Sequence, residues 1–236
     1  MGGTLKELMT LVVAIATERR CAGLRLREDP FFGRLPSGSD EKAIDAAFKA
    51  GQRAADTIMT QYGRIPDQIA SALQVKLKWS DTPLQTARAV LFSEYGDRPP
   101  CITLYRHSIQ EANDLIREHE LSGLLALEDV APVHLTHELY HHLEANKLTE
   151  GTGDYRIQTH AWGPIRLRTG LPSLCEIAAD HFAKVVLGLK VPMKAVEFIT
   201  IYQYNREYAW QLLDQLTSSL QKTDMGNPLF KPSDGD

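Results

Sequence analysis

The segment that decides how this chain is interpreted reads His134-Leu135-Thr136-His137-Glu138-Leu139-Tyr140-His141-His142. Its flanks favour a helix, and His137 and His141 lie four residues apart within it. Residues at this spacing are displaced by about 40° around a helix and by one turn along it, so both imidazoles can reach one metal ion. Glu138 is the next residue in the turn and can touch water bound to that metal. Zinc suits this pattern because it accepts imidazole nitrogen and, in catalytic sites, keeps one position for water.

A third ligand should come from a separate element, and Glu176 is the best candidate. It belongs to the string Cys175-Glu176-Ile177-Ala178-Ala179-Asp180-His181-Phe182-Ala183, near the start of a helix expected over Ser173 to Leu187. Glu176 and Asp180 share one helix face, so Glu176 can bind the metal while Asp180 hydrogen-bonds the outer nitrogen of a ligand histidine. The alanines in this string allow two helices to approach closely. The pattern predicts one zinc ion per chain, held by His137, His141 and Glu176.

Other residues near the two motifs remain alternatives at this point. His134 shares the helix face of the two motif histidines and could replace Glu176, and Cys175 is a further possible ligand. His142 and His181 are expected to point elsewhere. The plain alternative is a histidine-rich helix without a metal, in which the acidic residues only complement a helix dipole or face solvent.

Together the two motifs resemble the gluzincin metallopeptidases, and more narrowly the ImmA/IrrE-type minimal metallopeptidase domain. The resemblance covers roughly residues 64–190, where a helix-strand-strand-helix pattern precedes the motifs. It implies that His137, His141 and Glu176 bind zinc. It also implies that Glu138 is the general base and acid and that Asp180 supports a ligand histidine. The implied fold is zincin-like, with a small sheet packed on the metal-binding helix and a ligand-bearing helix after it.

The chain departs from that family in three places. Residues 142–175 separate the two motifs by a long interval, residues 120–128 are inserted before the metal-binding helix, and the first 63 residues show no family element. Family members often work with DNA-binding regulators, and no such module is evident here. These departures leave the substrate range open.

The hydrophobic spacing predicts an α+β chain that is mostly helical, with a small, mostly antiparallel sheet. We expect an N-terminal helical segment over 1–63, a zincin-like metallopeptidase domain over 64–221 and a frayed tail over 222–236. Ser39 should cap the second helix and Gly63 should end it. The strand over Cys101 to Tyr105 precedes the metal-binding helix and is expected to offer an edge to an extended substrate. Helices are expected at 4–21, 40–62, 67–74, 108–119, 129–146, 173–187 and 192–221, and strands at 75–79, 86–95, 101–105, 156–162 and 165–168.

Composition excludes several other classes of protein. The 26 Lys and Arg residues face 30 Asp and Glu residues, so there is no basic excess to neutralise a nucleic acid. Cys21, Cys101 and Cys175 are too few and too far apart for a disulfide framework, which favours a reducing compartment. The mostly apolar run from Leu8 to Thr17 is too short to span a membrane, which takes about 20 residues. We therefore expect a cytoplasmic protein with no nucleic-acid or membrane partner.

The sequence favours hydrolysis of peptide bonds in a peptide or protein substrate by metal-activated water, with Glu138 as the general base. Two other functions stay open at this point. One is a catalytically silent, zinc-containing regulatory or protein-interaction module, and the other is a helical protein whose histidine cluster binds no metal. A donor that would stabilise the oxyanion is not assigned. By type and position the candidates are Tyr155, His160, Tyr202 and Tyr204.

Overall fold

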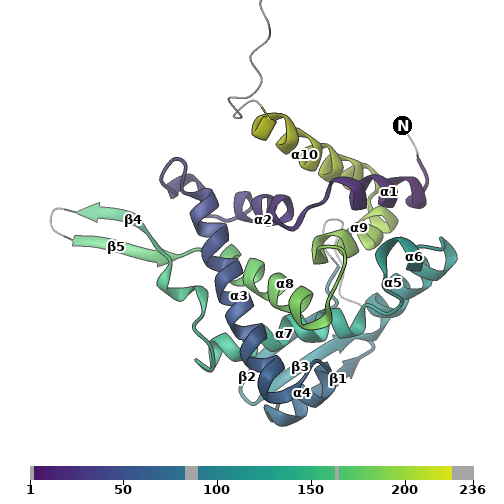
Figure 1. Cartoon of the computed structure of the whole chain (residues 1–236), viewed down its shortest axis with the longest axis horizontal. Coiled ribbons are helices and arrows are strands. Elements are labelled where there is room, and N and C mark those ends of the chain that lie inside the picture. The colour runs from purple at the N-terminus through teal and green to yellow at the C-terminus, as the bar shows by residue number, and fades with distance from the viewer. Residues whose placement is uncertain (1–2, 83–89, 163–164, 225–236) are drawn as a thin grey trace, which may run out of the picture.

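Short strands and long helices follow one another along the chain in the computed structural model, which describes residues 3–82, 90–162 and 165–224 (Figure 1). The chain is α+β and mostly helical, as the sequence predicts. The elements are α1 Leu5–Ile15, α2 Glu18–Arg27, η1 Phe32–Arg34, α3 Asp40–Tyr62, α4 Pro66–Ala72, β1 Lys76–Ser80, β2 Ser93–Asp97, β3 Pro100–Tyr105, α5 Arg106–Glu118, α6 Ser122–Leu125, α7 Ala131–Ala145, η2 Thr152–Asp154, β4 Arg156–Trp162, β5 Ile165–Gly170, α8 Pro172–Leu187, α9 Met193–Tyr204 and α10 Arg206–Asp224.

The main sheet has the strand order β1-β3-β2, with β1 parallel and β2 antiparallel to β3. The expected mostly antiparallel sheet is therefore wrong for these three strands, which form a mixed sheet. The expected edge is also wrong, because the strand over Cys101 to Tyr105 lies in the centre. Its nearly continuous apolar run is typical of a strand buried on both faces, and four of its six residues are buried.

The expected strand over 86–95 begins later, at Ser93, and continues to Asp97. Part of the expected range, residues 86–89, lies outside the described residues. Because β3 lies in the centre, β2 is one edge strand of the described sheet and β1 is the other.

The helices are stacked on the sheet in a definite order. α7 contacts β2 and β3, α8 packs against α7, and α3 packs against α8 on the side away from the sheet (Figure 1). One continuous cluster of buried apolar side chains includes residues of α1, α2 and α3 together with residues of α7, α8 and α9. The first 63 residues thus contribute to the same core as the helices that carry the two motifs.

Two helices that the sequence predicts as single are each divided. The expected helix over 4–21 breaks between α1 and α2, where the Thr17 side chain accepts a hydrogen bond from the backbone N–H of Arg20 and starts a new helix. The expected helix over 192–221 breaks at Asn205, whose backbone is not helical. None of the helices in the described ranges has both the length and the apolar character to cross a bilayer.

The predicted end of α3 at Gly63 is confirmed, whereas the predicted cap at Ser39 is wrong. Gly63 ends α3 with a φ of 80°, which only glycine adopts easily. Ser39 precedes α3, but its hydroxyl donates to the carbonyl of Pro36 at 2.6 Å and does not cap the helix.

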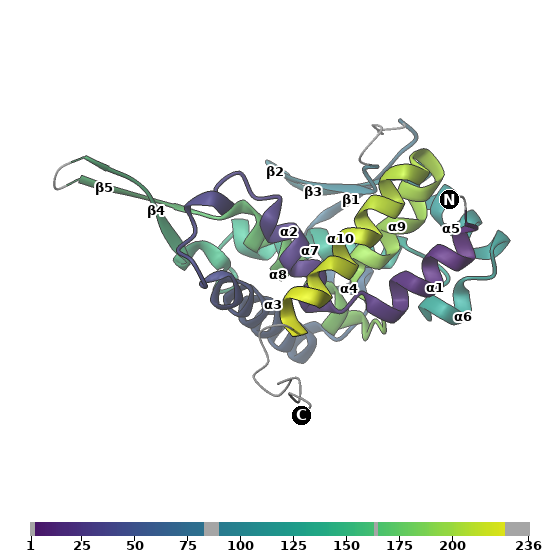
Figure 2. The ribbon, with the colours of Figure 1, turned by 90° about the horizontal axis from the view of Figure 1, so that it is seen from above.

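The pairing predicted between residues 156–162 and 165–168 is confirmed by the antiparallel strands β4 and β5. This hairpin extends away from the helices (Figures 1 and 2). Its expected turn at residues 163–164, and residues 225–236 of the expected frayed tail, lie outside the described residues.

The contact between α3 and α8 depends on the absence of a side chain at Gly51. A Cβ atom added there would lie 2.5 Å from the carbonyl oxygen of Ala178 in α8 and 3.2 Å from the backbone nitrogen of Phe182. The two helix backbones are therefore too close for any residue larger than glycine. Gly51 sets the distance between α3 and the helix that carries Glu176.

We expect Gly51→Ala to destabilise the protein by about 1–3 kcal/mol, because the added methyl group must push α8 away from α3. In a chain of this size each kcal/mol lowers Tm by about 2–4 °C, which thermal unfolding would measure. Gly23→Ala in α2 is the matched control, since its Cβ would approach only the end of the Arg27 side chain, at 3.9 Å. An equal loss of Tm in both variants would contradict this account of the α3–α8 contact.

Candidate metal centre

The helix α7 presents His137 and His141 on one face, as the sequence predicts. Asp129 accepts a hydrogen bond from the backbone N–H of Ala131, the first residue of α7, and Pro132 lies in the first turn of the helix. Most of this helix is buried between the sheet and α8. The Nε2 atoms of His137 and His141 face one another at 3.0 Å.

Glu176 in α8 completes a set of three donors. One carboxylate oxygen lies 3.4 Å from Nε2 of His137 and the other lies 3.4 Å from Nε2 of His141. Zinc with bonds of about 2.0–2.2 Å in a tetrahedral arrangement places its ligand atoms about 3.3–3.6 Å apart. The three side chains therefore fit one ion with little adjustment, and they lie close enough together to bind one.

The site is partly accessible from solvent on the side of Glu176. The side chains of His137 and His141 are 9% and 19% exposed, whereas that of Glu176 is 40% exposed. Access from outside is consistent with a ligand set that leaves a position for water or substrate.

The outer nitrogen, Nδ1, of each imidazole also contacts a neighbouring side chain. These contacts keep Nε2 of both rings directed at the place between the three donors where a metal ion would bind. Nδ1 of His137 lies 2.9 Å from Oδ1 of Asp180 as an ion-pair contact, and among the described residues neither of these buried atoms has a hydrogen-bond partner. The structure thus brings Asp180 to the place that the sequence predicts for it. Nδ1 of His141 lies 3.2 Å from the sulfur of Cys175. Such outer contacts fix the orientation of a ligand ring.

The charges of the three donors are strongly coupled. Burial lowers the pKa of His137, but its hydrogen bonds to Asp180 and Glu176 outweigh burial and raise that pKa to about 10. Burial raises the pKa of Glu176, but the hydrogen bond and charge of His137 lower it to about 2. Burial and the neighbouring His137 charge lower the pKa of His141. The surroundings of the three donors thus favour one positive charge at this place, carried by the proton on His137. A bound cation would supply that charge instead of the proton.

Asp180 is in turn held by a buried charged cluster that the sequence motifs do not reveal. Nη2 of Arg25 in α2 lies 3.7 Å from Oδ2 of Asp180 and 3.0 Å from Oε1 of Glu197 in α9. Nζ of Lys194 lies 2.8 Å from the other oxygen of Glu197. Burial raises the pKa of Glu197, but Lys194 and Arg25 outweigh it and lower that pKa to about 2. Arg25 therefore keeps a positive charge beside the carboxylate that orients His137.

Glu138 points toward the sheet side of α7. Its Oε1 atom accepts a hydrogen bond of 2.8 Å from the hydroxyl of Ser93, the first residue of β2, and the residue is only 7% exposed. Ser93 is a second contact that sequence reasoning missed, because no local pattern marks a serine at the start of a strand as the partner of a distant glutamate.

The alternative ligands lie outside the set of three donors. His134 stacks on Phe92 with ring centroids 4.1 Å apart, and burial lowers its pKa to about 3. Cys175 contacts the outer nitrogen of His141 instead of the shared position.

His142 and His181 point away from the site, as expected. His142 contacts the Tyr95 hydroxyl at 3.0 Å, and His181 contacts Glu18 of α2 at 2.6 Å.

The candidate oxyanion donors are engaged elsewhere. The hydroxyl of Tyr155 donates to the carbonyl of Ser39 at 3.3 Å, that of Tyr202 donates to the carbonyl of Gly3 at 2.6 Å, and that of Tyr204 donates to Glu111. The side chain of His160 lies outside the described part of the structure. These tyrosines therefore serve packing and helix contacts.

Comparisons of the chain with protein-family models, with curated proteins and with solved structures gave no match. The interpretation of the site accordingly depends on its own geometry.

We expect the wild-type protein to bind one zinc ion per chain, and His137→Ala or Glu176→Gln to weaken binding by more than about 100-fold, because each removes a direct ligand. Competition with a chromogenic chelator would measure the affinities. His107→Asn is the control, since His107 is an exposed residue of α5. Equal zinc binding by wild type and the two ligand variants would exclude this site.

We expect Arg25→Lys to weaken zinc binding by about 10-fold while the protein stays folded. The ammonium group keeps the charge but loses the planar geometry that contacts Asp180 and Glu197 together. Arg27→Lys, on the exposed side of the same helix, should bind zinc like wild type. Thermal unfolding would separate a loss of affinity from a loss of structure. Unchanged affinity in the Arg25 variant would show that this cluster does not orient His137.

Proposed function

We propose that this chain is a zinc-dependent peptidase of the gluzincin type, similar to the ImmA/IrrE-type metallopeptidase domain, that hydrolyses peptide bonds. The observation that carries the proposal is the convergence of His137, His141 and Glu176, three donors from two helices, at separations of 3.0–3.4 Å, close to those of a tetrahedral ion. Glu138 directly follows the donor His137 in α7, as the proposed general base requires.

Zinc bound by the three donors would polarise the substrate carbonyl and make a neighbouring water more acidic. The carboxylate of Glu138 takes a proton from the attacking water and passes it to the leaving amine. Ser93 holds one oxygen of that carboxylate at 2.8 Å and so restricts the direction in which the other oxygen can accept a proton. Asp180 and Cys175 keep the two imidazoles turned toward the site.

The edge of β2 is the place where we expect an extended substrate to bind. β2 contacts α7, and its first residue touches Glu138. A peptide added to this edge would form backbone hydrogen bonds with the strand and lie beside the metal-binding helix. This assignment replaces the edge expected at Cys101 to Tyr105, which lies in the centre of the sheet.

A catalytically silent zinc-containing module is the second candidate. One observation favours it: the Glu138 side chain is buried, and one of its two oxygens is already occupied by Ser93. In that function zinc would stabilise the packing of α7 against α8, and the surface of the domain would serve a regulatory partner.

We expect zinc-loaded wild type to cleave members of a quenched fluorescent peptide library and Glu138→Gln to cleave them between about 100-fold and 10,000-fold more slowly. The variant keeps every zinc ligand, so its zinc content should equal that of wild type. Glu118→Gln, an exposed residue of α5, is the matched control. Chelation should abolish cleavage and added zinc should restore it.

The outcomes separate the two candidates. Cleavage that survives in Glu138→Gln would rule out the proposed mechanism. Zinc binding without cleavage of any library member would favour the silent module.

A further inference from the structure

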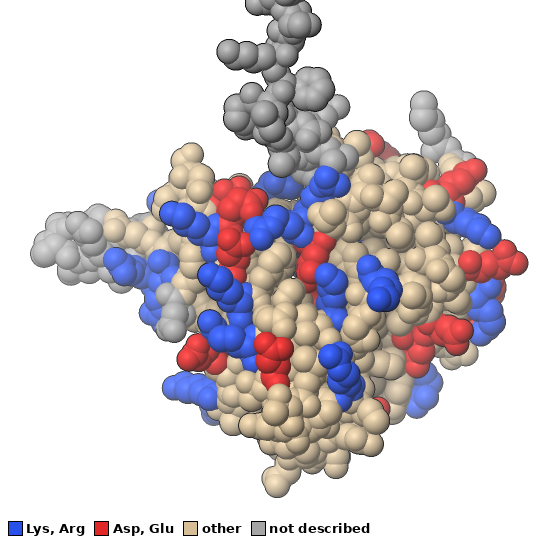
Figure 3. Space-filling model, viewed as in Figure 1, with Lys and Arg blue, Asp and Glu red and all other residues tan. Residues whose placement is uncertain are grey.

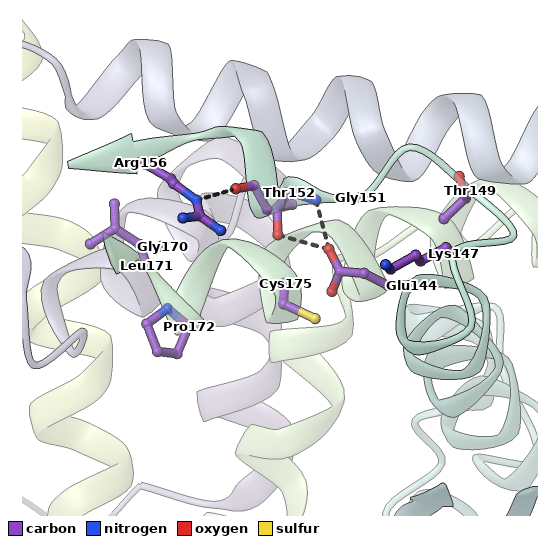
Figure 4. A pocket seen from close by; sticks show the side chains of 11 residues that line it. Glu144, Lys147, Thr149, Gly151, Thr152, Arg156, Gly170, Leu171, Pro172 and Cys175 are labelled. Atoms are coloured by element: carbon purple, nitrogen blue, oxygen red, sulfur yellow. Dashed lines mark hydrogen bonds between the residues drawn. The ribbon is translucent and has the colours of Figure 1, made fainter. Parts of the chain in front are cut away.

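An open cleft of about 650 Å³ lies beside the metal centre (Figure 4). Its walls are the C-terminal end of α7, the segment around η2, the end of β5 and the start of α8. Such a volume is typical of a site for a small molecule or a few residues of a peptide. The residues of its lining that matter here are Glu144, Lys147, Thr152, Arg156 and Cys175.

The cleft lies next to the metal donors, and Cys175, which contacts the outer nitrogen of His141, connects the two. Cys175 lines it, and the sulfur of Cys175 lies 3.2 Å from Nδ1 of His141. Glu176 follows Cys175 in α8, and Glu144 follows His141 by less than one turn in α7. A peptide whose carbonyl reaches the metal can extend past His141, so that residues a short distance along its chain lie in this cleft.

Two cationic side chains face each other across the cleft. Figure 4 shows Arg156 and Lys147 on opposite sides, with Glu144 and Cys175 between them. Nε of Arg156 donates to the carbonyl of Gly153 at 3.1 Å, which orients the guanidinium group. Among the described side chains, neither Arg156 nor Lys147 has a carboxylate within ion-pair distance. Both charges are thus available to a ligand.

Among the described side chains of the lining, Glu144 is the one carboxylate, and it is already engaged. Oε1 of Glu144 accepts hydrogen bonds from the backbone N–H of Thr152 at 2.6 Å and from its hydroxyl at 2.9 Å. Its negative charge is therefore held by the η2 segment, and the cleft keeps an excess of positive charge. Figure 3 shows further Lys and Arg side chains over α3 and near the base of the hairpin. Lys49 and Arg53 line a neighbouring hollow that shares Gly151 and Thr152 with the cleft.

We propose that this cleft binds acidic residues of the peptide substrate next to the scissile bond, with Lys147 and Arg156 contacting their carboxylates. The proposal rests on the proposed peptidase function, because it assigns the cleft to the same substrate. The planar guanidinium of Arg156 matches a carboxylate with two parallel hydrogen bonds, and Lys147 adds a compact charge on the other side. The substrate class is therefore an acidic peptide segment.

Hydroxamate peptides test this assignment, because a hydroxamate binds zinc and places the attached residues beside it. The first probe pair, acetyl-Glu-Glu-hydroxamate and acetyl-Gln-Gln-hydroxamate, carries the hydroxamate at the C-terminus of the peptide. The second pair carries it at the N-terminus, on a malonyl group that precedes Glu-Glu-amide or Gln-Gln-amide. The pairs extend to opposite sides of the metal. In at least one pair we expect zinc-loaded protein to bind the Glu form about 3- to 10-fold more tightly than the Gln form, by calorimetry. This preference should decrease as salt is added.

Lys147→Gln with Arg156→Gln should remove the preference while leaving the affinity for the Gln probes and the zinc content unchanged. Lys147→Gln alone, which keeps the Arg156–Gly153 bond, should reduce the preference and provides the test if the double variant does not fold. Lys76→Gln with Lys78→Gln, on exposed positions of β1, is the control and should keep the full preference.

The outcomes distinguish this proposal from the peptidase function on which it rests. Binding of the Gln probes without a Glu preference, or a preference that survives in the double variant, would overturn the acidic-substrate assignment alone. Failure of every hydroxamate to bind zinc-loaded protein would show that the zinc is not accessible to a substrate, and this would overturn both the peptidase function and the acidic-substrate assignment.

Discussion

The position of α8 relative to α7 is the constraint on which the rest of the structure depends. The Glu176 carboxylate lies 3.4 Å from both imidazoles. This distance requires a specific position of α8 along its axis, and a specific rotation about that axis, relative to α7. Bringing His137, Glu176 and Asp180 together also shields three ionisable groups partly from water, which is unfavourable unless each is paired. Contacts of 2.9 Å to Asp180 and 3.4 Å to Glu176 pair His137 with both carboxylates, in line with its raised pKa. Small shifts of α8 would therefore disturb both the donor geometry and the charge balance.

The N-terminal segment provides most of the contacts that hold α8 in that position. Its helix α3 approaches α8 so closely that only glycine fits at residue 51. The loop before η1 supplies Asp29, whose carboxylate accepts the backbone N–H of Ser173 at 2.9 Å and so caps the start of α8. Along α2, Arg25 pairs with Asp180, and Glu18 contacts His181 and Lys184. Residues 1–63 therefore belong to the support of the metal centre, although they resemble no part of a minimal metallopeptidase domain.

The parts of the site that sequence could predict are those fixed within a single helix. A spacing of four residues places His137 and His141 on one face of α7, and the same spacing places Glu176 and Asp180 on one face of α8. Contacts between elements have no such local signature, so Arg25, Ser93 and the role of Cys175 were missed. The sheet order was missed for another reason. The mostly apolar segment from Cys101 to Tyr105 is typical of a strand buried on both faces, but we expected an edge there because the segment precedes the predicted metal-binding helix.

The contact between Ser93 and Glu138 bears on whether the site can carry out proton transfer. A carboxylate held by a backbone N–H or an arginine is stabilised only in its ionised form, which opposes protonation. A serine hydroxyl can donate to a carboxylate and can equally accept from a carboxylic acid. The 2.8 Å bond to Ser93 therefore survives a change in the protonation of Glu138 by rotation of one hydroxyl hydrogen. Because Ser93 also opens β2, a peptide bound at this edge would lie beside a base whose orientation is the same before and after it takes a proton. This property suits the general base that we propose for Glu138.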